Sequence, residues 1–113
     1  MNTMRESQTA VLERGIRLHD EFATEPFEAP WAKEARWFLQ FLEPSPGATV
    51  AVTAQISADG LTWVDHELPP VQGQATGVIT APVRDFGHWL RLVVRRSGGE
   101  TDPLTRVYLA LKE

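Results

Sequence analysis

The chain has 113 residues and a formal net charge of −4, and it contains no cysteine. This length suits one domain that buries about two-thirds of the surface of its unfolded chain, while the acidic charge argues against general affinity for nucleic acid or an anionic membrane. The absence of cysteine excludes disulfides, thiolate metal ligands and a cysteine nucleophile.

The first eight residues are polar, and we expect residues 1–8 to form a flexible arm ahead of a single domain at residues 9–113. The arm lacks the apolar stretch that a secretion signal requires, so we expect no signal peptide. No other stretch is long and apolar enough for a membrane span. We therefore expect a protein that is cytoplasmic or associated with a particle such as a virion.

Prolines and apolar spacing define the elements in the first third of the chain. Pro26 and Pro30 have no amide hydrogen to donate, which restricts the segment between them to the edge of a sheet. Pro30 also suits the first position of a helical turn, whereas residues 35–42 are apolar on both faces, as in a central strand. The predicted elements are a strand at 9–18, whole or broken at Gly15, a short strand or irregular edge at 22–27, a helical turn at 31–35 and a strand at 35–42.

The segment Thr49–Val64 has the pattern of a β-hairpin. Apolar residues alternate with polar or small ones over residues 50–56, as a strand with one buried face requires. Asp59-Gly60 supplies the turn, because glycine accepts a positive φ without steric cost and aspartate bonds nearby backbone amides. Trp63 opens the returning strand, and we expect its ring, like that of Trp37, to lie in the core.

Three further strands are predicted at 75–81, 86–96 and 104–112. The last two alternate clearly, with residues such as Leu92 and Leu109 facing inward, and the turn at 97–100 is expected to join them as a second hairpin. The chain thus contains about eight short strands separated by turns, with at most one short helical turn. This pattern is typical of an all-β protein, an antiparallel β-sandwich or jelly roll.

The hairpin sequence Gln55–Trp63 resembles the Ser-x-Asp-Gly-x-x-Trp hairpin of discoidin-type, galactose-binding-like jelly rolls. Residues His88–Leu92 match the aromatic-apolar-Arg-apolar pattern of a later strand in that family, and Arg106–Leu111 is similar to its closing strand. The same elements recur in small β-sandwich proteins encoded among phage and prophage structural genes, which this chain resembles more closely in length. The resemblance implies the architecture. No binding residue is carried over, because no ligand loops are recognisable between the first strands.

Two clusters contain residues suited to acid–base or metal chemistry, His19-Asp20-Glu21 and Asp65-His66-Glu67. The first lies in a turn, and in the second, on a strand, His66 points away from its two neighbours. A metal site would therefore require the two histidines to meet in space. His88 is expected to be a hydrogen-bonded histidine at the end of the sheet, and no serine lies in a nucleophile motif. We expect no enzymatic activity, no cofactor and no metal.

Aromatic and cationic residues are the candidates for a binding surface. Alternate residues of the last two strands are expected to form one outward face of rings and arginines, a composition enriched in protein interfaces. The alternative is a solvated face on which arginines lie over aromatic rings in cation–π contact. Including one exposed tryptophan between prolines, the candidate interface residues are Trp31, Trp89, Arg91, Arg95, Arg106 and Tyr108.

Two functions are compatible with this sequence. The first is a non-catalytic structural or assembly protein, such as a component of a virion-like or other multi-subunit particle, whose partners are proteins, either further copies of itself or other subunits. The alternative, which the discoidin resemblance implies, is a carbohydrate-binding module in which an exposed tryptophan stacks on a sugar ring. We expect neither nucleic acid nor a membrane among its partners.

Overall fold

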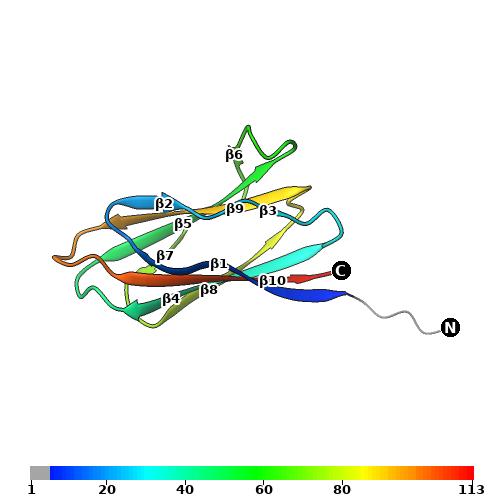
Figure 1. Ribbon diagram of the computed structural model, residues 1–113. Coiled ribbons are helices and arrows are strands. Elements are labelled where there is room, and N and C mark those ends of the chain that lie inside the picture. Colours follow the sequence, from blue (N-terminus) through cyan, green and yellow to red (C-terminus); the bar gives the residue numbers. More distant parts are fainter. Residues whose placement is uncertain (1–5) are drawn as a thin grey trace.

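The computed structural model describes residues 6–113, and every helix or strand assigned in that part of the chain is a β-strand (Figure 1). The ten strands are β1 (Ser7–Arg17), β2 (Glu21–Ala23), β3 (Phe27–Glu28), β4 (Glu34–Glu43), β5 (Thr49–Ser57), β6 (Val64–Asp65), β7 (Val71–Gln74), β8 (Val78–Arg84), β9 (Trp89–Ser97) and β10 (Leu104–Lys112). Within residues 6–113 there is no helix that is long and apolar enough to cross a membrane.

The strands form two antiparallel sheets packed face to face. The four-stranded sheet has the order β1-β10-β4-β8. The six-stranded sheet is built on the path β2-β9-β5-β6, with β3 paired to β9 and β7 paired to β5. Figure 1 shows the two sheets as separate layers. The prediction of an antiparallel β-sandwich is confirmed.

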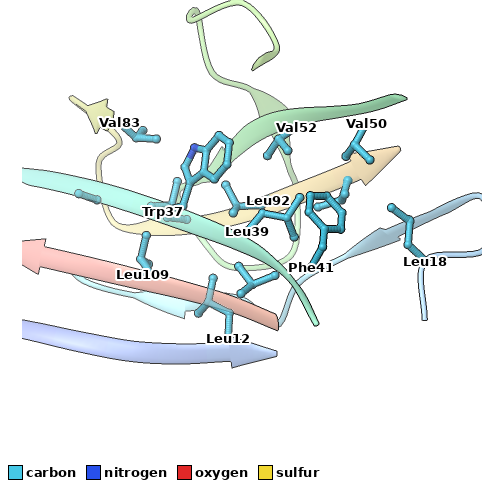
Figure 2. Packing of buried hydrophobic residues seen from close by; sticks show 14 of the residues in the cluster. Leu12, Leu18, Trp37, Leu39, Phe41, Val50, Val52, Val83, Leu92 and Leu109 are labelled. Atoms are coloured by element: carbon cyan, nitrogen blue, oxygen red, sulfur yellow. The ribbon is translucent and has the colours of Figure 1, made fainter. Parts of the chain in front are cut away.

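Strand β4 lies between β10 and β8 and supplies the largest side chains of the core. Trp37, Leu39 and Phe41 point from β4 toward the six-stranded sheet, and the Trp37 side chain is one of the largest that are fully buried (Figure 2). Alternate residues of β9 face them from the other sheet, and alternate residues of β10 point inward beside them in the same sheet, as predicted. Those fully buried residues are Leu90, Leu92, Val94, Val107, Leu109 and Leu111.

The first strand begins earlier than the sequence pattern indicates. Of the predicted arm at residues 1–8, residues 1–5 lie outside the described residues, while Ser7 already belongs to β1. The break expected at Gly15 takes the form of two register shifts against β10, both located between Val11 and Ile16. These irregularities bend the strand without ending it.

The helical turn predicted at 31–35 is wrong. A single turn at Pro30-Trp31, closed by a bond from Ala32 N to Ala29 O at 3.3 Å, forms instead, and it begins before the predicted segment. One such bond does not offset the entropy of fixing a helical turn. The chain is instead already extended at Glu34, which pairs with residues of both β10 and β8. The strand or irregular edge predicted at 22–27 resolves into two short edge strands, β2 and β3.

Candidate functional site

The two strands that carry most of the predicted interface belong to different sheets. Strand β9 lies in the six-stranded sheet and β10 in the four-stranded sheet, so the turn at 97–100 carries the chain from one layer to the other. Their outward residues therefore lie on opposite outer faces of the sandwich, and the prediction of one joint face is wrong. Trp89, Arg91 and Arg95 lie on one layer, Arg106 and Tyr108 on the other, and Trp31 in the loop between β3 and β4.

On the six-stranded sheet, Arg91 is held by its own chain. Its guanidinium lies 4.4 Å from the centre of the Trp63 ring, and its Nε donates to Gln55 Oε1 at 2.8 Å. Gln55 in turn donates to Asp65 at 2.9 Å. This is the cation–π arrangement predicted as the alternative to a free interface. Trp63 is half-buried on the outer face rather than in the core, because the hairpin folds back over the sheet.

The other candidates on this layer also contact their own chain. Trp89 is half-buried, stacks on His88 at 5.9 Å, and lies so close to Gly60 that an added Cβ there would sit 3.0 Å from the ring. Arg95 is bonded to Glu21 at 2.8 Å. Trp31 packs against the core. Their proposed roles in binding, including sugar stacking, therefore stay predictions. A partner or a sugar would have to contact tryptophan rings that are already half-buried.

The turn after β5 is closed by a compact network that explains the Ser-x-Asp-Gly motif. Ser57 Oγ accepts from the amides of Asp59 and Gly60 at 3.2 and 2.8 Å and donates to Asp59 Oδ1 at 2.9 Å. The same carboxylate oxygen accepts from the amides of Leu61 and Thr62, each at 2.9 Å. Gly60 has a φ of 78°, which its lack of a side chain permits. The bonds from Thr62, Leu61 and Ser57 lower the pKa of Asp59 to about 2.

This lowered pKa predicts a pH-dependent contribution of Asp59 to stability. Because the pKa of a free aspartate is about 3.9, the contribution is complete above that value and is lost as the pH falls toward about 2. Thermal unfolding of the wild type and of Asp59→Asn should therefore differ most near neutral pH and converge in acid. Other carboxylates titrate in both proteins, so the measured quantity is the difference in Tm between them. A difference that is constant with pH contradicts the prediction.

The segment beyond β5 forms a projecting knob, residues 58–68, that rises from the six-stranded sheet and includes its edge strand β6 (Figure 1). Its base is fixed by His66, which is buried, donates from Nε2 to Arg84 O at 2.6 Å and accepts the Leu68 amide on Nδ1 at 3.1 Å. These two bonds select the neutral ring with its proton on Nε2. The knob has no lysine or arginine. Its acidic residues are Asp59, Asp65 and Glu67, and its exposed apolar residues are Leu61, Val64 and Leu68.

The remaining histidines are bonded separately. His19 Nδ1 lies 3.2 Å from Asp102 Oδ2, and His88 Nε2 lies 2.6 Å from Glu28 Oε2, so the prediction of a hydrogen-bonded histidine at the sheet end is confirmed. Across residues 6–113, no three side chains of the kinds that bind metals converge on one point.

The outer face of the four-stranded sheet carries the remaining two predicted residues, Arg106 and Tyr108. Tyr108 lies directly between Val11 on β1 and Phe38 on β4, which makes an apolar row across three strands. We call the outward surface of β10, β8 and residues 34–42 of β4, together with Val11, the cationic face. Its charged residues are Glu34, Arg36, Arg84, Arg106 and Lys112, and its exposed apolar residues include Val11, Leu42 and Val78.

The cationic face contains a shallow hollow of about 270 Å³. Its floor includes Phe38, Pro82 and Ala110, and charged side chains from three strands stand around it. The sequence interpretation found Arg106 and Tyr108 but missed Arg36 and Phe38. The signal was present, because residues 35–42 are apolar on both faces and one of those faces is the outer one.

Comparisons with known proteins establish the fold. No family model matches the chain, and no curated protein is detectably similar to it in sequence. Among solved structures, the PBSX exported protein XepA has a TM-score of 0.66 at 9% identity over 92% of this chain, which spans 36% of XepA. The SPBc2 prophage-derived protein YomS has a TM-score of 0.60 at 9% identity over 100% of this chain and 98% of its own.

A protein of Bacillus endospore appendages, which form disulfide-linked pili, has a TM-score of 0.55 at 10% identity over 99% of this chain and 91% of its own. At such identities the likeness concerns the fold alone. The chain is a jelly-roll β-sandwich of the kind found in prophage-encoded proteins, so the predicted resemblance is confirmed at that level.

Proposed function

We propose that this protein is a non-catalytic structural subunit that acts through protein–protein contacts in a larger, particle-like assembly. The cationic face is the observation that carries the proposal. It combines four cations and one carboxylate with the half-buried rings and exposed aliphatic side chains of an open sheet, in a chain whose net charge is −4. Exposed apolar area of this kind marks interaction surfaces, and tyrosine, phenylalanine and arginine are enriched in them.

The solved neighbours support this proposal. YomS is prophage-derived and of nearly the same extent, and the endospore appendage protein belongs to a pilus. Those pili are linked by disulfides, whereas this chain has no cysteine. Any assembly that it forms with its own copies is therefore held without disulfides, and surfaces such as the cationic face are the candidates for its contacts.

Sedimentation velocity over a wide range of protein concentration tests the proposal. We expect the mean mass of the wild type to rise with concentration, or a stable complex to form with the product of a neighbouring gene. Arg36→Glu should weaken that association about 10-fold or more, because Arg36 is exposed and lies on β4, the middle strand of the face. The double variant Gln72→Glu/Gln74→Glu makes the same change in net charge on the other sheet and should associate normally. A strict monomer that also binds none of those gene products contradicts the proposal.

A further inference from the structure

The exposed large apolar side chains of residues 6–113 fall into two groups. Val11, Leu42 and Val78 lie on the cationic face, and Leu61, Val64 and Leu68 lie on the knob. Leu61 is 84% exposed, more than any other of the six. Neither group is needed to fill the core, so both are surfaces without a partner in the single chain.

The two surfaces are opposite in charge and lie on opposite layers. The knob has three carboxylates and no lysine or arginine, whereas the cationic face has four cations and one carboxylate. Figure 1 shows the knob rising from the six-stranded sheet, on the side away from the four-stranded sheet. The base of the knob borders the edge of its own cationic face, because His66 donates to Arg84 O at 2.6 Å. The tip of the knob around Leu61, which is 84% exposed, is the part left for a second molecule.

We propose that the knob of one copy docks on the cationic face of a second copy, so that the chains join head to tail. This inference rests on the proposed function, and it identifies the two surfaces through which the copies contact each other. Pairing either surface with itself would place like charges opposite each other, which is unfavourable. Pairing the two different surfaces matches both charge and apolar area. Such a heterologous contact produces a ring if its rotation closes and a filament if it does not.

The hollow in the cationic face is suited to Leu61. Its floor is apolar, with Phe38, Pro82 and Ala110, and its cations can meet the carboxylates that flank the leucine on the knob. An apolar anchor seated in a pocket and surrounded by a polar rim is one arrangement that binding interfaces use. The knob is also rigid before docking, because Asp59 and His66 hold its turn and its base. Docking therefore orders few additional groups.

The size of the cationic face limits the strength of each contact. Three strands about 4.8 Å apart and about nine residues long give a face of roughly 30 Å by 14 Å. That is about 420 Å², below the roughly 800 Å² per partner of a standard stable interface. A single contact should accordingly be weak and sensitive to salt, and association should grow with protein concentration rather than produce a fixed dimer.

Mixing two variants tests the head-to-tail arrangement. Leu61→Asp disables the knob at an exposed position, and Arg36→Glu disables the cationic face. Each variant alone should associate about 10-fold or more weakly than the wild type, with an unchanged circular dichroism spectrum and Tm. An equimolar mixture should recover a complex with one copy of each variant, because one intact knob meets one intact face. That complex should grow no further, whereas the wild type continues to larger species.

The outcomes separate this inference from the proposed function. If the wild type associates but the mixture forms no 1:1 complex, or if Leu61→Asp associates normally, the pairing of knob and face is wrong and the assembly uses other surfaces. A wild type that stays monomeric at every concentration also overturns the pairing, and the proposed function then depends on binding to another protein. The variant Gln72→Glu/Gln74→Glu serves again as the control for net charge.

Discussion

Replacement of Trp37 with alanine should lower the free energy of unfolding by about 3–5 kcal/mol, the range for large aromatic residues removed from a well-packed core. Trp37 is 2% exposed and lies on β4, which is paired on both sides, so the neighbouring strands cannot collapse into the space that the ring leaves. Figure 2 shows the ring between the two sheets, beside Val52 and Leu39. Urea denaturation followed by circular dichroism measures the change.

Trp63→Ala is the matched control, since it removes the same side chain from the outer face. The Trp63 ring is half-buried and contacts the Arg91 guanidinium. Such a cation–π contact is worth about 0.5–1 kcal/mol at an exposed site. We expect a loss of about 1–2 kcal/mol, including the partly buried area of the ring. Equal losses for the two variants would show that Trp63 also belongs to the core, as the sequence pattern indicated, and that the placement on the outer face is wrong.

These two tryptophans show what local pattern can and cannot predict. Both stand in apolar, strand-like surroundings, and alternation placed Trp37 correctly because β4 is long enough to establish a register. Trp63 precedes a strand of two residues, β6, so there is too little pairing to fix its side. Its position is decided instead by Arg91, which is 28 residues away and adjacent only after β9 has paired with β5.

The same limit applies to the candidate site. Alternation correctly separated inward from outward residues on β9 and β10, and the outward assignment of Arg106 and Tyr108 agrees with the structure. It carried no information about which strands pair, so a connection between layers was interpreted as a hairpin. The charge pattern of the knob, in contrast, can be read from the sequence, because residues 58–68 are a run of acidic and apolar residues without a lysine or arginine.

The turn between β9 and β10 is therefore decisive for the fold, and Gly99→Ala should disrupt it. Gly99 has a φ of 76°, and a Cβ there would lie 2.7 Å from Ser45 Oγ and 2.8 Å from Ala48 Cβ, both of which are buried. Backbone strain of about 1–2 kcal/mol and overpacking of about 1–3 kcal/mol should together lower the free energy of unfolding by roughly 2–5 kcal/mol.

Gly77→Ala separates the two contributions, because Gly77 has a similar φ of 67° but no atom within 4 Å of an added Cβ. It should show the backbone strain alone, about 1–2 kcal/mol. Denaturant unfolding of both variants gives the loss in free energy of unfolding for each. The additional loss in Gly99→Ala measures how tightly the turn packs on Ser45 and Ala48. That packing directs β10 into the four-stranded sheet and so sets Arg106 and Tyr108 on the layer opposite the knob. If the two variants lose the same stability, the close approach at Gly99 does not hold the crossing in place.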